Sequence, residues 1–154
     1  MLEPRGLYRL AWGLLFASCL AQLAWAERIM VRPGESDLQA VLDKAADGDT
    51  IVLEGRHHGA VRLTRKLTLE AAPGAVLEGP GHGSVITVAS PGAVVRGLII
   101  RGSGTNLEEM DAGVFVEKTA TGALVEGNRI EGNLYGIYLL TCAQGCLDVV
   151  VSKQ

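Results

Sequence analysis

The chain has 154 residues, 20 of them glycine, and a formal net charge of −3. This length is enough for one domain, and a glycine content well above the usual ~7%, without a collagen period, favours a turn-rich β fold. The mild charge and the absence of a basic patch or stripe argue against a nucleic-acid surface.

Residues 1–26 are typical of a secretory signal peptide. Arg5 and Arg9 give a positive start, an apolar run follows, and Ala24-Trp25-Ala26 is an A-x-A cleavage site. A membrane anchor is one alternative, although the run is shorter than the ~20 residues of a membrane span. A lipoprotein cut before Cys19 is another. We therefore expect an exported mature chain that begins at Glu27 and has no membrane span after cleavage.

Residues 27–48 predict a short strand (27–31) followed by an amphipathic helix (36–46). The Ser36 side chain can accept from the backbone N–H of Gln39, and the Gln39 side chain can bond the backbone N–H of Ser36, which is a capping box. Gly48 is a residue type that suits the C-terminal end of a helix. The apolar residues follow the i, i+3, i+4, i+7 pattern of one helix face: Leu38, Val41, Leu42 and Ala45. The first coil of a β-solenoid has one face without a neighbour, so we interpret the helix as an N-terminal cap. An ordinary surface helix is the alternative.

Residues 49–140 contain short aliphatic runs separated by turn residues, such as the Gly127-Asn128 and Gly132-Asn133 pairs. The runs are too short for helices and too regular for loops, so they indicate strands. A unit that repeats about every two dozen residues winds into a parallel β-helix. We predict an all-β solenoid, a right-handed parallel β-helix of about four coils, with strands at 49–55, 60–63, 67–69, 75–77, 84–88, 93–95, 98–100, 113–116, 123–125 and 136–139.

The register of these coils can be predicted from matching residues. Residues 94–100 line up with 124–130 at an offset of 30, which places the structural glycine Gly97 on Gly127. The excess length of that interval falls in a loop at 102–111. Similar strings at 73–79, 91–97 and 121–127 suggest a simpler alignment, but spacings of 18 and 30 fit no single period.

Two kinds of structural residue follow from that register. Inward aliphatic residues should stack, one per coil, at Val61, Ile86, Val114 and Ile137. Asn128 matches Leu98 of the preceding coil, so an asparagine ladder cannot pass through this step. We therefore expect Asn128 to be a turn residue with a local role.

Residues 141–154 depart from the repeat. No Asn-x-Ile-x-Gly unit and no polar cap follow, so a solenoid that ends there would expose apolar residues and unpaired strand edges. We predict that the tail is truncated or frame-shifted, and a short domain that dimerises through its open end is the alternative. Cys142 and Cys146 could form a disulfide or hold a metal.

Two segments resemble known families. Residues 127–139, with GNRIEGN and YGIYL, resemble the right-handed β-helix (PbH1) repeat of carbohydrate-binding proteins and sugar hydrolases. LEEMDAGVFV, residues 107–116, is similar to a segment of the NosD family, the periplasmic maturation factors of nitrous oxide reductase. The NosD family also matches this chain in the order of its segments, which is signal peptide, helix, Gly-Asp-Thr-Ile-Val-Leu, His-His-Gly and β-helix. The resemblance covers residues 28–140, and NosD proteins are much longer.

The NosD resemblance implies a periplasmic accessory protein rather than an enzyme. The resemblance also implies that this protein's partners are the subunits of an ABC transporter and nitrous oxide reductase, in denitrification. The protein would support assembly of the copper–sulfur centre of the reductase, so copper is a possible cofactor.

The histidines are candidate copper ligands, because imidazole suits Cu(II), whereas the sulfur atoms of Cys and Met suit Cu(I). His57 and His58 adjoin a predicted turn, and His82 lies about one coil later. Adjacent residues of a strand point to opposite faces, so a turn would be needed to bring the pair together. Polar turn residues are the alternative interpretation of this trio.

The densest acidic stretch is Glu108, Glu109, Met110 and Asp111, which we predict to be a partner or loop surface. A solvated loop is one alternative. A hydrolase or lyase site is another, but it needs carboxylates ~5–9.5 Å apart, and we assign no catalytic residue. Polysaccharide binding or processing is the second function hypothesis. A carboxylate cluster with an aromatic platform would favour it, but with only Tyr135 and Tyr138 in the late coils this combination is not evident from the sequence. A non-functional fragment is the third.

Overall fold

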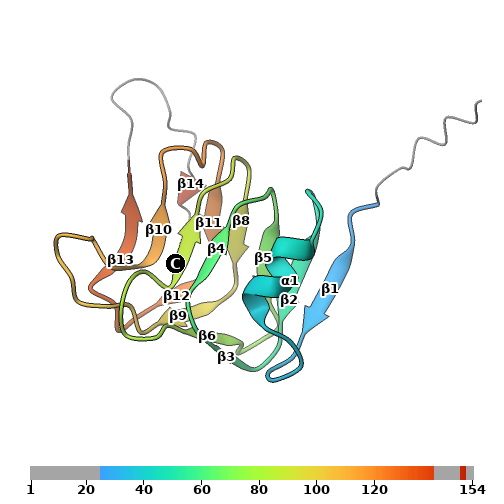
Figure 1. Ribbon diagram of the computed structural model, residues 1–154, viewed down its shortest axis with the longest axis horizontal. Coiled ribbons are helices and arrows are strands. Elements are labelled where there is room, and N and C mark those ends of the chain that lie inside the picture. The colour runs from blue at the N-terminus through green and yellow to red at the C-terminus, as the bar shows by residue number, and fades with distance from the viewer. Residues whose placement is uncertain (1–24, 141–149, 152–154) are drawn as a thin grey trace, which may run out of the picture.

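The computed structural model describes residues 25–140 and 150–151, which are nearly all parallel β-sheet with one short helix (Figure 1). In chain order, the elements are β1 (Arg28–Val31), α1 (Leu38–Lys44), β2 (Thr50–Leu53), β3 (Arg56–His58), β4 (Val61–Leu63), β5 (Thr68–Ala71), β6 (Val76–Glu78), β7 (Ile86–Val88), β8 (Val94–Arg96), β9 (Ile99–Arg101), β10 (Ala112–Val116), β11 (Leu124–Glu126), β12 (Arg129–Ile130), β13 (Tyr135–Leu139) and β14 (Val150–Val151).

These strands form three sheets. Sheet A has the order β1-β2-β5-β8-β11-β14, sheet B the order β12-β9-β6-β3, and sheet C the order β13-β10-β7-β4. From β2 to β13 the chain therefore visits sheets A, B and C in turn and then repeats the circuit. The paired strands within the described residues run parallel. The arrangement is consistent with a parallel β-helix.

The inward residues of sheet C stack as predicted. Val61 pairs with Ile86, Ile86 with Val114, and Val114 with Ile137. The first three are buried, and Ile137 packs against the same core, which also receives side chains from sheets A and B. Each fully buried aliphatic side chain contributes roughly 1.5–3 kcal/mol. The core therefore lies between the three sheets and leaves their outward faces free for other roles.

The predicted offset of 30 residues is confirmed where β8 pairs with β11 and β9 with β12. Gly97 and Gly127 are thus equivalent turn positions, and their φ values of +73° and +60° favour glycine. The similar string at 73–79 is correctly left out of this alignment. It contains β6 of sheet B, whereas β8 and β11 belong to sheet A.

Asn128 does more than the local role that we predicted. Its side chain is buried, Oδ1 accepts from the backbone N–H of Leu98 at 3.0 Å, and Nδ2 donates to the carbonyl of Val95 at 3.0 Å. Asn133 likewise accepts from the backbone N–H of Ser103 at 3.0 Å. The prediction failed because these asparagines bind the backbone of the preceding circuit, so they need no asparagine beneath them.

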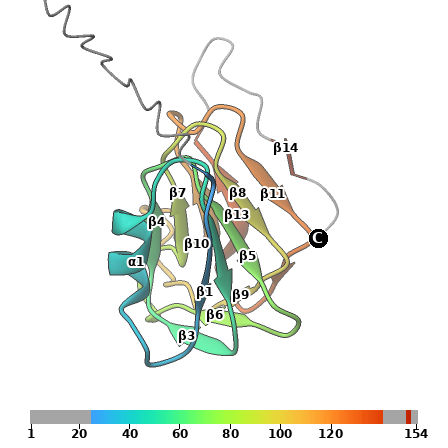
Figure 2. The ribbon, with the colours of Figure 1, turned by 90° about the vertical axis from the view of Figure 1, so that its right-hand side faces the viewer.

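The helix packs beside the first strands of the sheets, and its role as a cap of a solenoid stays a prediction. Leu38 and Leu42 are buried in the core. The amide of Gln39 accepts from the N–H of Arg62 at 2.8 Å and donates to its carbonyl at 3.1 Å. Arg62 is the middle residue of β4, the edge strand of sheet C, so α1 satisfies backbone groups at that edge. Figure 2 shows α1 beside β4.

The predicted ends of this helix were wrong. Asp37, not Ser36, is the N-cap, and its carboxylate accepts from the N–H of Gln39 at 3.2 Å. No capping box forms because the Gln39 side chain binds β4 instead. The helix ends at Lys44, before Gly48.

Three strands occur where we predicted none. β3 contains both histidines of the expected turn, and β12 pairs with β9. β14 pairs with β11 through Val150 and Val151, within the tail that we expected to depart from the repeat. Cys142 and Cys146 lie outside the described residues.

Candidate functional site

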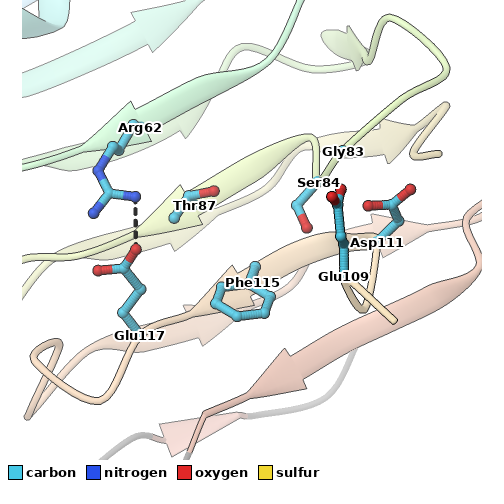
Figure 3. Close-up of a pocket in the computed structure, with 8 residues that line it drawn as sticks. All are labelled: Arg62, Gly83, Ser84, Thr87, Glu109, Asp111, Phe115 and Glu117. Atoms are coloured by element: carbon cyan, nitrogen blue, oxygen red, sulfur yellow. Dashed lines mark ion pairs between the residues drawn. The ribbon is translucent and has the colours of Figure 1, made fainter. Parts of the chain in front are cut away.

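An open groove lies on the outward face of sheet C (Figure 3). Its volume is about 230 Å³. The residues that line it come from β4, β7, β10, the segment that follows β10, and the loops before β7 and β10: Arg62, Gly83, Ser84, Thr87, Glu109, Asp111, Phe115 and Glu117. Side chains distant in sequence therefore meet here because the sheet places equivalent strand positions side by side.

The floor of the groove follows from the register of sheet C. Arg62 pairs with Thr87, Thr87 with Phe115, and Phe115 with Tyr138. Because alternate residues of a strand point to opposite faces, this row points outward while its neighbours fill the core. Thr87 has the smallest side chain of the row and lies between Arg62 and Phe115, which have long side chains. The surface is therefore hollowed at Thr87.

The row ends in an aromatic cluster. The rings of Phe115 and Tyr138 are stacked with centroids 5.6 Å apart and an interplanar angle of 11°. Tyr135 adds a tilted contact to Tyr138 at 5.5 Å and 59°. Such pairs contribute ~0.5–1.5 kcal/mol beyond the area they bury. The three side chains are only half-buried, so the cluster also presents ring surface to solvent.

The charged groups of the groove are unevenly balanced. Arg62 Nη1 and Glu117 Oε1 form an ion pair at 2.6 Å across the groove (Figure 3). The lining also contains Glu109, which is exposed, and Asp111, which is only 3% exposed. The lining thus contains three carboxylates and one guanidinium, and that guanidinium is already paired. Such a lining is rich in hydrogen-bond acceptors and suits ligands that bring donors or positive charge.

The loop from 102 to 111 positions the acidic end. The Asn106 side-chain oxygen accepts from the N–H groups of Glu108 and Glu109 at 3.0 and 3.3 Å. Asp111 Oδ2 in turn accepts from the N–H of Asn106 at 2.9 Å. Met110, with φ of +56°, occupies the left-handed region, which is uncommon for a residue with a Cβ. These contacts give Glu109 a defined place beside the groove.

Gly104 makes room for the buried carboxylate of this loop. A Cβ built on Gly104 would lie 2.0 Å from Asp111 Oδ2 and 2.8 Å from the backbone nitrogen of Gly83. No side chain fits there unless Asp111 moves. We did not recognise this position from the sequence, because the contact joins two residues of one irregular loop.

The structure separates the four residues predicted to form a partner or loop surface. Glu108 and Glu109 are exposed, Met110 is half-buried, and Asp111 is buried. Glu109 and Asp111 line the groove, whereas Glu108 and Met110 do not. Their role in binding a partner stays a prediction.

The three histidines predicted to hold copper are not gathered into a site. His57 is buried, and its Nε2 lies 3.0 Å from the carbonyl oxygen of Glu54. His58 points to the opposite face of β3, where its Nδ1 lies 3.9 Å from Glu78 Oε2. His82 is exposed in the loop before β7. Within 25–140, no group of three or more His, Cys, Asp and Glu side chains could hold a metal ion. These residues do not fit a copper centre.

Sequence reasoning missed most of the groove. Arg62, Thr87 and Phe115 have no common sequence motif and become neighbours only through the register of β4, β7 and β10. The available signal was the ladder of Val61, Ile86 and Val114. Each outward residue directly follows one of these inward residues, so the row could have been found by moving one position along each strand.

The fold and the groove define a parallel β-sheet protein with an open groove on one outward face. No family model and no solved structure matches the chain. Two curated relatives do. The probable ABC transporter binding protein NosD of Pseudomonas aeruginosa is 43% identical over 93 residues, which are 60% of this chain and 22% of that protein. The protein of the same name from Stutzerimonas stutzeri is 30% identical over 97 residues, 63% of this chain and 21% of its own.

The chain is thus similar to NosD, and it spans about a fifth of the length of these curated relatives. Among residues 25–140 and 150–151, no helix is long and apolar enough to cross a membrane.

Proposed function

We propose that this protein is a periplasmic, non-catalytic accessory protein of the NosD type. In this proposal, it works with an ABC transporter to support assembly of the copper–sulfur centre of nitrous oxide reductase. The observation that supports this best is the 43% identity to a probable ABC transporter binding protein named NosD. The proposal includes export through residues 1–26 and a closed, right-handed β-helix of about four coils.

The role proposed for this chain is a scaffold for protein partners rather than a site of chemistry. Copper is what the assembly handles, and no described residue is assigned to hold it. The outward faces of the sheets are available for partners because the core between the sheets is already filled by aliphatic side chains.

A chimera tests this function. The matching segment of Pseudomonas aeruginosa NosD is replaced by residues 28–140 of this chain, in a strain whose own NosD gene is deleted. We expect the chimera to restore nitrous oxide reduction and the copper content of the purified reductase. The transporter subunits should be retained when the chimera is captured from solubilised membranes.

The control chimera carries Ile86→Asp, which places a charge in the fully buried core and should abolish both readouts. The proposal fails if the intact chimera is exported at a normal level but leaves the reductase without copper. Edman sequencing of the exported protein should begin at Glu27 when the first 26 residues are present.

Polysaccharide binding is a second candidate, and one observation favours it. Phe115, Tyr135 and Tyr138 come together beside a groove that also holds carboxylates, and a combination of aromatic rings and carboxylates favours this hypothesis. Sedimentation with chitin, cellulose or peptidoglycan tests it. Retention that Phe115→Leu weakens would support it, whereas equal amounts of protein with and without the solid would contradict it.

A further inference from the structure

We propose that the groove on the outward face of sheet C is a docking site for a segment of a partner protein that inserts a lysine or arginine side chain. The inference rests on the proposed function, which requires protein partners but does not say what they present. It assigns both a surface of this chain and the chemistry of the partner.

The first reason is charge. Glu109, Asp111 and Glu117 line the groove against a single guanidinium, that of Arg62. Arg62 is paired with Glu117 at 2.6 Å, so its charge is neutralised locally. Asp111 is only 3% exposed and accepts from the N–H of Asn106. Glu109 is therefore the exposed groove carboxylate that is left to attract positive charge, and hydrogen bonds from ammonium or guanidinium groups to carboxylates are the stronger kind.

The second reason is the aromatic wall. Phe115 lines the groove and uses one side of its ring to stack on Tyr138 of β13. Thr87 lies on the other side, on β7, so a side chain that enters above Thr87 meets the Phe115 ring. A cation over an aromatic ring contributes about 0.5–1 kcal/mol at an exposed site.

The third reason is the shape of the surface, which favours a macromolecule. Pockets for small molecules bury most of the ligand surface, and this groove is too open to do so (Figure 3). The face continues from the groove over β10 and β13, where Phe115, Tyr138 and Tyr135 remain half-buried. An extended segment could place its charged side chain in the groove and apolar side chains on these rings.

A protein segment fits the lining better than a polysaccharide. Sugar hydroxyls call for donors as well as acceptors, and the strongest donor of the groove, Arg62, is occupied by Glu117. The exposed charged group that the lining leaves unneutralised is the carboxylate of Glu109, which accepts hydrogen bonds and does not donate them. Binding of a neutral glycan is therefore the competing outcome of the test.

The experiment measures binding of labelled peptides to the purified protein by fluorescence anisotropy. The probe is a short, end-capped peptide with lysine and arginine spaced among leucine and glycine. The comparison peptide has glutamine in place of every lysine and arginine, and soluble chitin oligosaccharides represent the glycans. We expect the cationic peptide to bind, the binding to weaken with added salt, and both other probes to fail.

Matched variants locate the site. Glu109→Gln removes a groove carboxylate and Phe115→Leu removes the ring, and each should weaken peptide binding by about two- to fivefold. Glu108→Gln makes the same charge change in the adjacent exposed residue, outside the groove, and should leave binding unchanged. Circular dichroism and thermal melting check the fold. Glu109→Gln keeps the test decisive if Phe115→Leu does not fold.

Three results would overturn this docking site. They are no binding of the cationic peptide, equal binding of the glutamine peptide or of the oligosaccharides, and an equal loss with Glu108→Gln and Glu109→Gln. The chimera experiment gives a separate answer. If the chimera restores copper to the reductase but the peptide does not bind, the groove assignment fails and the accessory function stands.

Discussion

The outward faces of sheets A and C share one architecture but differ in what their side chains leave free. Both are parallel ladders above the same aliphatic core. In sheet A, the outward row from β5 to β11 is Glu70, Arg96 and Glu126. In sheet C, the corresponding kind of row is Arg62, Thr87, Phe115 and Tyr138.

The charges of sheet A satisfy one another. Glu70 is bound by Arg28 and by Arg96, the latter at 3.0 Å, and Arg96 also lies 3.7 Å from Glu126. Burial opposes the charge of the Glu70 carboxylate, but the hydrogen bonds from Arg28 and Arg96 outweigh it and lower the pKa of Glu70. On this face, the charges of Glu70, Arg96 and Glu126 are thus engaged with one another and with Arg28.

Sheet C has one neutralised pair, further carboxylates and exposed ring surface. A repeating backbone therefore does not decide which outward face leaves charged and aromatic groups available to a ligand. The core requires only the inward residues. The side chains of an outward row can therefore either form ion pairs with one another or leave groups available to a ligand. We therefore expect inward changes to affect both faces, and outward changes to affect stability on sheet A and binding on sheet C.

The largest effect should come from the shared core. Ile86→Ala removes a side chain with 0% exposure from the ladder of sheet C, which should lower the free energy of unfolding by about 2–4 kcal/mol. Urea denaturation followed by circular dichroism measures it. Thr87→Ala, the next residue but outward, is the control and should change stability by less than about 1 kcal/mol. Equal losses in the two variants would contradict the inward and outward assignment.

A change in the turn between β11 of sheet A and β12 of sheet B should lower stability nearly as much. Asn128→Ala leaves the backbone N–H of Leu98 and the carbonyl of Val95 without the partners that Asn128 supplies, which should destabilise the protein by about 2–3 kcal/mol. Amide hydrogen exchange should show faster exchange at Leu98. Asn128→Asp retains the acceptor for Leu98, so protection there should partly survive, and its complete loss would contradict the assigned orientation of the amide.

A smaller effect is expected in the loop that borders the groove. Gly104→Ala forces Asp111 to move, because the new Cβ would lie 2.0 Å from Oδ2. We expect a loss of about 1–3 kcal/mol in thermal unfolding, with weaker binding of the cationic peptide. Gly136→Ala is the matched control in β13, where the nearest atom is Ile130 Cγ2 at an ordinary 3.8 Å. If both variants melt alike, the close approach at Gly104 is wrong.

The smallest effect belongs to sheet A and depends on pH. Because folding lowers the pKa of Glu70, its contribution is present above the unfolded value of about 4.3 and is lost as the pH falls through the folded value. Glu70→Gln should therefore cost about 0.5–1 kcal/mol at pH 7, a range that allows for solvent screening, and almost nothing in strong acid. Thermal melts across pH measure the difference, and Glu108→Gln is the control. A difference that persists in acid would contradict the ion-pair explanation.

The core and its register could be predicted because they depend on periodic residues. The inward positions of Val61, Ile86, Val114 and Ile137 follow from burying one aliphatic side chain per circuit, and every observed circuit must obey the same rule. The apolar face of α1 follows from helical spacing in the same way. Gly97 and Gly127 were predictable because a repeated turn requires the same backbone conformation.

Irregular contacts could not be predicted in this way. The Gln39 side chain bonds the backbone of β4 instead of forming a capping box. The local sequence around Gln39 does not show that a sheet edge lies beside it. The bonds of Asn128 to the preceding circuit were missed because they end on backbone atoms. The loop around Asp111 depends on Gly104, a contact that has no period at all.

The amino-acid sequence alone therefore predicts a glycine-rich parallel β-protein with a helix near its start, a ladder of inward residues and a resemblance to NosD. Which outward residues become neighbours depends on the strand register in the folded protein. The tertiary structure kept His57, His58 and His82 out of one site and brought Arg62, Thr87 and Phe115 into one groove. The physical reason is that burial constrains every inward residue in the same way. An outward residue acquires a role only from the particular side chains that the register places beside it.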